Sequence, residues 1–313
     1  MSEAPIVLGL DFGGTKIAAA VCDIDGVRLG TRTVDSLAEA GAAASFERAV
    51  LAGQALMESV APGRRLAAVA ACTFGIPRED RIDLAPAIPG WTELALADEL
   101  RAVFGDVEIR LATDVKAAAQ AEAQWGALVD CDPGIYLNLG TGLAVAIVAG
   151  GKVLSGHHRA SGEIGYNLRS IADVGRAAQA RVPLEDAVSG KVLARQADRL
   201  LAGKDAEQKV AWLFTAALVD PEAARVLDEF VNELAFHLVN LAIAIDPVRI
   251  VVGGGLVKSW EYLQGGLRAA LDAAVPYPPE LLIGAFPFDA PLMGALALGT
   301  AAARDSSIQG VPV

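Results

Sequence analysis

The sequence predicts an α/β protein made of two similar domains, on three observations. Patterns typical of buried strands alternate with helical patterns along the chain, which favours layers of helices and sheets. A unit of strand, glycine-rich turn and strand occurs near the N-terminus and again near the middle of the chain. The length of 313 residues also suggests about two domains, at roughly 150 residues per domain.

The N-terminal unit has the pattern of a β-hairpin. Residues 6–10 form an apolar run that predicts a strand, and residues 17–21 predict the strand that returns. Between them, residues 11–15 (Asp-Phe-Gly-Gly-Thr) predict a glycine turn. The hairpin therefore places Asp11 at the end of a buried strand.

The same unit recurs in the middle of the chain. Residues 135–139 predict a strand, residues 140–142 (Gly-Thr-Gly) predict a turn, and residues 143–148 predict a second strand. When the two units are aligned, Asp11 corresponds to Asn138. Two copies this far apart predict a duplicated domain rather than a repeat of short period.

The other elements continue the alternation of helices and strands. We expect helices over residues 45–60, 114–126, 184–201, 207–218, 221–245 and 257–274. We expect strands over residues 66–73, 107–112, 249–252 and 281–286. Proline and glycine predict loops at 75–90 and 276–279.

Charge and hydropathy exclude several classes of protein. Lys and Arg total 26 against 38 Asp and Glu, and the net charge of −12 argues against nucleic acid or an anionic membrane as partner. The mean hydropathy of +0.41 comes largely from Ala and Gly, and no apolar run is long enough to span a membrane. The N-terminus lacks a basic signal region, and the three cysteines predict buried free thiols. We therefore expect a soluble, cytoplasmic protein.

The first glycine turn combines groups that bind phosphate. Gly13 and Gly14 let backbone amides converge on an anion, Thr15 adds a hydroxyl donor, and Lys16 adds a cation. Asp11 is an unusual residue for the end of a buried strand, and we interpret it as an outer ligand of Mg²⁺, through water. The alternative is a plain glycine hairpin in which Asp11 serves as a turn residue.

Two more glycine turns follow predicted buried strands. One belongs to the repeated unit, and the other lies between the strand 249–252 and a predicted helix, where a phosphate or ribose can approach. Each alone also fits a purely structural turn, but together the three predict a nucleotide gripped between two similar domains. No P-loop or dinucleotide-binding pattern is present. The residues of the two turns are Gly140, Thr141, Gly142, Gly253, Gly254 and Gly255.

Asp114 is the candidate catalytic base. It lies where a predicted strand ends and an Ala-rich helix begins, so the helix dipole stabilises its carboxylate, which can accept the proton of a substrate hydroxyl. Aspartate is also a preferred N-cap residue, with a contribution of about 1 kcal/mol, and this structural role is the alternative.

The three histidines do not predict a metal site. His157 and His158 flank a glycine-rich loop, and His237 fits the buried side of a helix. Because none has a second ligand at a metal-binding spacing, we expect no zinc site.

Five short motifs resemble the ROK family (repressor, open reading frame, kinase) of bacterial sugar kinases and regulators. Their order and spacing match over nearly the whole chain, and they are Leu10–Lys16, Leu139–Gly142, Gly162–Gly165, Val252–Gly255 and Gly294–Ala297. The resemblance implies the duplicated actin-like, ribonuclease-H-like fold with a central cleft. It implies a small lobe of residues 1–115 and 295–313 and a large lobe of residues 116–294. It also implies ATP, Mg²⁺ and a small-molecule sugar as ligands, and a homodimer.

The resemblance also implies roles for single residues. Asp114 matches the catalytic base, which orients a sugar hydroxyl, expected at C6, for in-line attack on the γ-phosphoryl group. Asp11 would engage Mg²⁺, the glycine turns would bind the phosphates and the nucleotide, and Glu163 would accept hydrogen bonds from sugar hydroxyls. The implied activity is that of a glucokinase-like, ATP-dependent kinase of a hexose or an amino sugar.

Several residues depart from the family pattern. Tyr166 replaces a histidine that commonly serves both the sugar and a structural zinc, and residues 167–182 contain none of the usual cysteines. Thr113, Lys116 and Ala87 stand where asparagines are usual, so the residues expected at the sugar (Thr113, Ala87 and Tyr166) differ from the pattern. Because polar contacts discriminate between sugars, glucose is not assumed, and no structural zinc is expected.

Two other functions stay open. The departures favour a catalytically weak, sugar-sensing regulatory protein of the same family, whereas the retained Asp11 and Asp114 favour an enzyme. An actin-like ATPase that acts without sugar would share the nucleotide turns but would have no use for Glu163.

Overall fold

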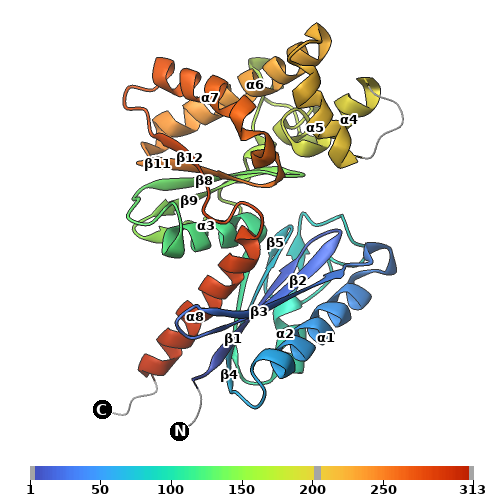
Figure 1. Ribbon diagram of the computed structural model, residues 1–313, viewed down its shortest axis with the longest axis vertical. Helices are drawn as coiled ribbons and strands as arrows, with labels where there is room; N and C mark the ends of the chain where they lie inside the picture. The colour runs from blue at the N-terminus through green and yellow to red at the C-terminus, as the bar shows by residue number, and fades with distance from the viewer. Residues whose placement is uncertain (1–3, 201–205, 310–313) are drawn as a thin grey trace. The chain divides into compact units, whose positions relative to one another are not determined.

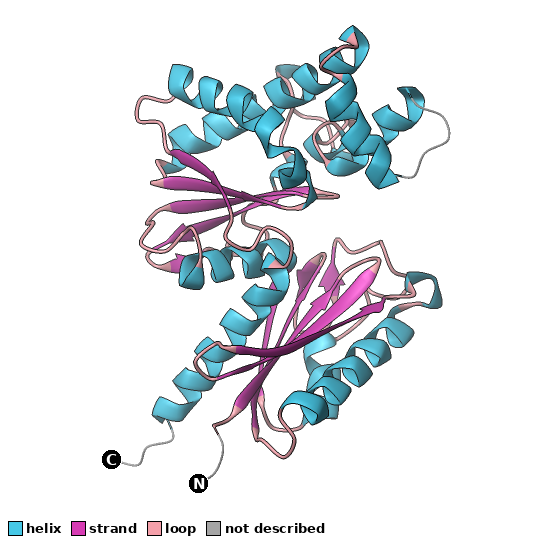
Figure 2. Cartoon of the chain, in the orientation of Figure 1, coloured by secondary structure: helices cyan, strands magenta, loops and turns pink. Residues whose placement is uncertain are grey.

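The computed structural model describes residues 4–200 and 206–309 of the chain (Figure 1). The chain forms two compact units, the first made of Met1–Gln124 with Asp289–Val313 and the second made of Trp125–Phe288. Each unit has its own sheet and its own helices (Figure 2). The predicted α/β class is therefore confirmed in both units.

Five strands form the main sheet of the first unit. They are β1 (Ile6–Phe12), β2 (Lys16–Asp23), β3 (Arg28–Asp35), β4 (Leu66–Thr73) and β7 (Glu108–Thr113). Their order is β3-β2-β1-β4-β7, with β1, β4 and β7 parallel and β2 antiparallel to both of its neighbours. Because β1, β4 and β7 are parallel, their carboxyl ends meet at one edge of the sheet.

Helices cover both faces of this sheet, which explains why β1 is a continuous apolar run. On one face, Leu8 lies against Gly53 of α1 (Ala42–Val60). On the other face, Gly9 lies so close to Leu296 of α8 (Ala290–Gln309) that a Cβ atom there would be 2.9 Å from Leu296 Cδ2. The two helices flank the sheet in Figure 1.

Two further helices of the first unit adjoin β7. α2 (Leu96–Phe104) precedes this strand, and α3 (Asp114–Trp125) follows it without an intervening loop. The segment predicted as the loop 75–90 contains a short hairpin of β5 (Ile76–Pro77) and β6 (Ile82–Asp83).

The second unit repeats the strand arrangement of the first. Its strands are β8 (Gly134–Leu139), β9 (Leu143–Ala149), β10 (Lys152–Val153), β11 (Arg249–Gly253) and β12 (Glu280–Ile283). Their order is β10-β9-β8-β11-β12, with β8, β11 and β12 parallel and β9 antiparallel to both of its neighbours. The sheet order and strand directions match those of the first unit, so the predicted duplication is confirmed.

Helices pack against one another and against this second sheet. They are α4 (Gly190–Leu200), α5 (Ala206–Ala216), α6 (Pro221–Ile245) and α7 (Trp260–Ala274). α6 begins with Asp220 as N-cap, whose carboxylate accepts the Glu222 amide at 2.9 Å, and it ends at Asp246, which has a φ of 52°. The buried residues of α6 and α7 share one core with β8 and β11.

Two of the predicted helices begin as 3₁₀ turns. The segment predicted as one helix over 184–201 contains a short 3₁₀ turn, η5 (Leu184–Asp186), before α4 begins, and residue 201 lies outside the described residues. The segment 257–274 begins as the 3₁₀ turn η6 (Gly255–Ser259) before α7. A glycine lies close to each departure, Gly190 shortly after η5 and Gly254 directly before η6, and the backbones of both pack closely against the ends of strands.

β3 and α2 are among the elements that were not predicted from the sequence. The exposed, partly charged residues of β3 hide the period of a strand, because β3 lies at the edge of the sheet. All three cysteines are buried free thiols, as predicted. Within the described part of the chain, no helix combines the length and the apolar composition needed to span a bilayer.

Candidate active site

The edge formed by the carboxyl ends of β1, β4 and β7 carries Asp11, Thr113 and Asp114. Asp11 pairs in register with Cys72, and Thr73 pairs with Thr113, which is followed at once by Asp114. The Cys72 thiol donates a hydrogen bond to Asp11 Oδ1 across 3.3 Å. Sheet topology thus brings together residues that are far apart in the sequence.

The two carboxylates influence each other. Burial, and after it the negative charge of Asp114, raises the pKa of Asp11 from its usual 3.8 to about 7, while the hydrogen bond from Cys72 acts in the opposite direction. A carboxyl group whose pKa is raised in this way is stabilised in its charged form by a cation nearby. The edge of the sheet is therefore suited to a positively charged ligand.

Thr113, rather than Asp114, caps α3. The Thr113 hydroxyl accepts the Lys116 amide at 3.2 Å, which is the usual contact of an N-cap side chain. Asp114 is the first residue of the helix, and its Oδ1 accepts the amide of the next residue, Val115, at 2.9 Å. The structural alternative for Asp114 is thus corrected, because the capping role belongs to its neighbour.

The first glycine turn joins β1 to β2. The Gly13 amide donates to the Lys16 carbonyl at 3.0 Å, and Ser36 holds the turn by donating from its hydroxyl to the Gly14 carbonyl at 2.8 Å. Gly14, Thr15 and Lys16 are exposed at the tip. Nothing lies within 4 Å of the position that a Gly14 Cβ would occupy, so the turn offers an open backbone surface.

Ala87 lies in an exposed turn before α2, between the buried residues Ala85 and Ile88. Trp91 holds this loop in place, because its indole N–H donates to the Thr73 hydroxyl at 2.9 Å. The loop is therefore well anchored, although the Ala87 side chain itself cannot form a hydrogen bond.

The second and third glycine turns lie at the ends of adjacent parallel strands, because Gly253 pairs in register with Asn138. Gly253 and Gly254 have packing reasons to be glycine, since Cβ atoms there would lie 2.0 Å from Tyr136 Oη and 2.5 Å from the Leu139 carbonyl. Gly255 is exposed, and nothing lies within 4 Å of its Cβ position. Gly255 thus offers the open backbone of the third turn.

The second turn is tied to the start of α4. The Gly190 amide donates to the Gly140 carbonyl at 2.8 Å, and the Lys191 amide donates to the Thr141 carbonyl. A Cβ atom at Gly190 would lie 2.6 Å from the Gly140 oxygen, so only glycine permits this approach. The turn residues Gly140, Thr141 and Gly142 are consequently held in one conformation.

Glu185 is a candidate site residue that the sequence analysis missed. Its carboxylate accepts the Leu143 amide at 2.9 Å, directly after the second glycine turn. Burial, and then the charges of Glu163 and Glu185, raise the pKa of the Tyr166 hydroxyl, which shows that the three side chains are near one another. The one signal for Glu185 in the sequence is its position shortly before Ser189 and Gly190, where α4 begins.

The comparison with known protein families decides the classification of this chain. Its residues 7–301 match the ROK family. The protein belongs to the ROK family. The kanosamine kinase of Amycolatopsis mediterranei is 28% identical over 307 residues, which cover 94% of this chain and 96% of that protein. A glucokinase of Thermotoga maritima is 27% identical over 90% of each chain.

Solved ROK structures share the fold. A ROK hexokinase from Thermus thermophilus has a TM-score of 0.78 and 29% identity, covering 96% of this chain and 99% of its own. A ROK glucokinase from Streptomyces griseus, solved with glucose and AMPPNP, has a TM-score of 0.76 and 25% identity, covering 95% and 99% of the two chains. The fold is therefore the actin-like ATPase fold, as the resemblance implied.

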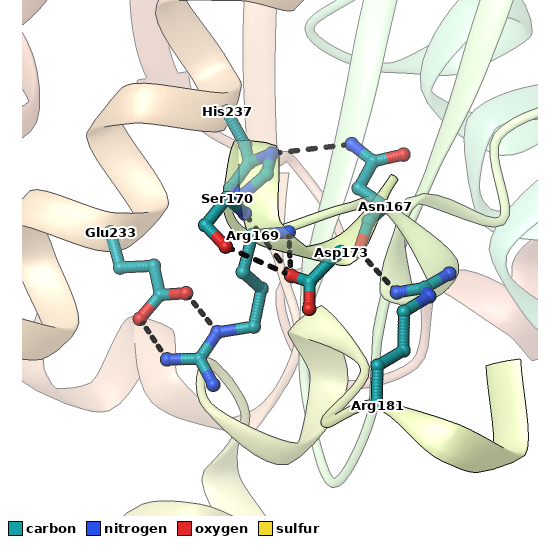
Figure 3. Close-up of polar contacts among 7 residues, drawn as sticks. All are labelled: Asn167, Arg169, Ser170, Asp173, Arg181, Glu233 and His237. Atoms are coloured by element: carbon teal, nitrogen blue, oxygen red, sulfur yellow. Dashed lines mark hydrogen bonds and ion pairs between the residues drawn. The ribbon is translucent and has the colours of Figure 1, made fainter. Parts of the chain in front are cut away.

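The structural zinc found in many ROK proteins does not fit the residues of this one. The stretch after Tyr166 is held instead by arginine, amide and carboxylate side chains (Figure 3), and residues 167–182 contain no cysteine. Arg169 forms a two-bond ion pair with Glu233, and Asp173 accepts the Ser170 amide at 3.1 Å. Within the described residues, no group of three His, Cys, Asp or Glu side chains could hold a metal ion.

Mg²⁺ is a different case, because this ion usually binds one or two carboxylates together with substrate phosphates. Asp11 supplies a carboxylate at the end of β1, and Asp114 adds negative charge nearby. The residues present therefore fit a magnesium ion held through Asp11, with the remaining ligands supplied by water and phosphate.

Proposed function

We propose that this ROK protein is an ATP-dependent sugar kinase, which transfers the γ-phosphoryl group to a hydroxyl group of a hexose or an amino sugar, expected at C6. The placement of Asp114 is the observation that carries the proposal. Asp114 lies beside Asp11 at the end of β7, and the N-cap of α3 is Thr113. The names of the kinase relatives support the same reaction class.

In the proposed reaction, Asp114 accepts the proton of the sugar hydroxyl as the hydroxyl oxygen forms a bond to the γ-phosphorus. The bond from that phosphorus to the oxygen bridging to the β-phosphate breaks, and its electron pair leaves with ADP. When bound, Mg²⁺ neutralises charge on the phosphates, and Asp11 would hold it. Since the transition state is loose, positioning and charge account for most of the rate.

The backbone turns would bind the phosphates and the nucleotide. Gly13 to Lys16 in the first unit, and the second and third turns in the other unit, offer exposed backbone and hydroxyl groups. Among the latter, Thr141 and Gly255 are exposed and Gly253 is buried, so we assign direct contact to the first two. Main-chain amides suit this task because they carry partial positive charge and do not titrate.

Acidic side chains of the second unit would bind the sugar. Glu163 would accept hydrogen bonds from sugar hydroxyls, with Tyr166 and Glu185 beside it. Thr113 and Ala87 would face the sugar from the first unit, and Ala87 offers no polar contact. Because a hydrogen-bonding site discriminates through its polar groups, we expect a preference different from that of members with asparagine there.

A panel of hexoses and amino sugars tests the proposal, with ATP, Mg²⁺ and a coupled assay of ADP release. We expect sugar-dependent ADP formation, with a phosphorylated sugar as product. ADP release that does not depend on sugar would instead support an ATPase. The absence of ADP with every sugar would contradict the kinase.

A catalytically weak sugar-sensing protein is the alternative, and one observation favours it. Lys116, which stands two residues after the candidate base at a position where an asparagine is usual, is buried. In that case a sugar would raise the melting temperature without any release of ADP. The panel therefore separates the two functions, provided that melting is measured with each sugar.

We also propose that the protein is a homodimer. Phe236 and Ile243 lie two turns apart on α6 and are 57% and 52% exposed, which is unusual for large apolar side chains. The net charge of −12 disfavours nucleic acid as the partner of this surface. Light scattering of the wild type and of Phe236→Asp tests the proposal, since we expect the substitution to yield monomers.

A further inference from the structure

We infer that Arg181 is a positioning residue for the turn Glu163–Asn167, and that it acts by holding two backbone carbonyl groups at the end of this turn. The inference rests on the proposed function, because that function gives Glu163 and Tyr166 their contact with the sugar. The turn is η2 (Ile164–Tyr166) with its two flanking residues.

Backbone contacts hold the N-terminal end of the turn. The Val145 amide of β9 donates to the Gly162 carbonyl at 2.9 Å. Gly162 has a φ of +86°, and a Cβ atom there would lie 1.8 Å from the Val145 oxygen. This end is therefore joined directly to the sheet through the backbone of β9.

The C-terminal end has no comparable support from the hydrophobic core. Between residues 167 and 182, Asp173 is the one buried residue. The large apolar side chains of this stretch point to solvent, with Ile171 92% exposed and Val174 67% exposed. Since apolar burial does not anchor this stretch, polar contacts must do so.

Arg181 contacts this end of the turn directly. Its Nη1 donates to the Asn167 carbonyl at 2.9 Å (Figure 3), and its Nη2 donates to the Tyr166 carbonyl. A guanidinium group holds its donors in a rigid fork, so one side chain fixes two successive peptide groups. A lysine has a single ammonium on a flexible chain and holds two carbonyls less well.

A second contact joins the same end of the turn to α6. Asn167 Nδ2 lies 3.3 Å from Nδ1 of His237, and one helical turn earlier Glu233 pairs with Arg169. Phe230 and Leu234 of α6 are buried in the core of the second unit. Asn167 is therefore held by two contacts, one from Arg181 to its carbonyl group and one from His237 of α6 to its side chain.

The surroundings of Arg181 allow a chemical test. Arg181 lines a cavity of about 1070 Å³ together with Arg169, Asp173 and Glu233. When the side chain is shortened to alanine, the vacated space is continuous with this cavity, so a small guanidinium ion can enter it. Added guanidinium is then expected to restore part of the lost contact.

The experiment compares Arg181→Ala and Arg181→Lys with Arg176→Ala as a matched control. Arg176 belongs to the same stretch, but it contacts Asp173 and the Ala180 carbonyl and no residue of the turn. Amide hydrogen exchange of a peptide covering residues 162–168 reports the order of the turn directly. Steady-state kinetics report the KM for sugar, the KM for ATP and kcat.

In Arg181→Ala we expect faster exchange in this peptide. We also expect the KM for sugar to rise about tenfold, which is the effect expected when a charge-assisted hydrogen bond is lost. The KM for ATP and kcat change little, because the turn binds sugar and transition state equally. Guanidinium lowers the sugar KM again, Arg181→Lys is intermediate, and Arg176→Ala resembles the wild type.

Unchanged exchange in Arg181→Ala overturns the inference, whatever the activity. Faster exchange with an unchanged KM for sugar overturns the link between the turn and the sugar. If Arg181→Ala exchanges faster but the wild-type protein phosphorylates no sugar, the proposed function is overturned and the structural part of the inference is supported. The two failures are thereby distinguishable.

Discussion

The Cys72 sulfur lies 3.3 Å from Asp11 Oδ1 and equally close to the Pro291 carbonyl at the start of α8. The thiol thus connects the carboxylate on β1 with the helix behind the sheet. Burial, followed by the charges of Asp11 and Asp114, raises the pKa of Cys72 well above its usual value, so the group is a neutral hydrogen-bond donor. A donor in this position holds one oxygen of Asp11 in a defined direction.

Replacement of Cys72 tests this contact. We expect Cys72→Ala to require several-fold more Mg²⁺ for half-maximal activity, because Asp11 loses the donor that orients it. Cys72→Ser retains a donor and serves as the control, with a requirement closer to that of the wild type. Equal magnesium titrations of all three proteins would show that the thiol plays no part in placing Asp11.

Asp114 and Thr113 are predicted to have separable roles. Asp114→Asn lowers turnover by about 10²–10⁴-fold, since the amide cannot accept the proton, and it leaves the free energy of unfolding nearly unchanged. Thr113→Ala costs about 1 kcal/mol of stability, because the Lys116 amide loses its capping hydroxyl. Urea unfolding and ADP release measure the two effects. Near-normal turnover of Asp114→Asn would refute its assignment as the base.

His237 predicts a dependence of stability on pH. His237 is 6% exposed, and its burial lowers the pKa of the imidazole below the usual 6.5. The charge of Glu233 opposes this shift in pKa, and the charge of Arg169 strengthens it. Since the unfolded chain then binds the proton more readily, the folded protein loses stability as the pH falls below 6.5 and continues to do so down to the lower folded pKa.

The measurement compares the melting temperatures of the wild type and His237→Gln between about pH 7.5 and pH 5.5. The glutamine cannot be protonated, so the difference between the two proteins is expected to shift in favour of the variant at the acidic end. In the neutral histidine that accepts from Asn167 at Nδ1, the proton lies on Nε2, which is buried and has no hydrogen-bond partner among the described residues. A pH-independent difference would argue against this account.

Gly294 and Gly14 make a matched pair of glycines with opposite expectations. A Cβ atom at Gly294 would lie 1.8 Å from the Ala117 oxygen, so Gly294→Ala must move α8 away from the helix that begins at Asp114. We expect a loss of about 1–3 kcal/mol or more in the free energy of unfolding. Gly14→Ala meets no atom within 4 Å, and its stability stays within about 0.5 kcal/mol of the wild type.

Nucleotide binding gives the second readout for these two glycines. If the first turn binds phosphate through its backbone, the added methyl group of Gly14→Ala raises the KM for ATP in a protein that is otherwise stable. Calorimetric titration with a non-hydrolysable ATP analogue checks this. Unchanged affinity would remove Gly14 from the phosphate-binding residues.

Much of the fold could be predicted because its signals are local. The apolar run of β1, the glycine turn after it and the second copy at β8 each occupy a few consecutive residues, and the structure confirms them. β3 was not predicted because it is an edge strand that exposes most of its residues, so its sequence of polar and apolar residues resembles that of a loop. The 3₁₀ turn η5 was not predicted because its residues continue the apolar period of α4, the helix that follows it.

The candidate site was only partly predictable for the same reason. Asp11, Asp114 and Glu163 stood out in the sequence because each is a charged residue beside a glycine turn or at a junction of elements. Glu185 and Arg181 did not, because nothing in their local sequence shows that one accepts the Leu143 amide and the other holds the end of the η2 turn.

The sequence by itself determined the class of fold, the duplicated unit and the presence of carboxylates at the ends of predicted strands, because these depend on the order of neighbouring residues. Only the tertiary structure decided that Asp11 meets Cys72, that Thr113 caps α3 in place of Asp114, and which of the glycines have an open backbone. These relationships depend on the order and register of strands that lie far apart in the chain. Such pairing follows from the packing of the whole unit, and no local pattern records it.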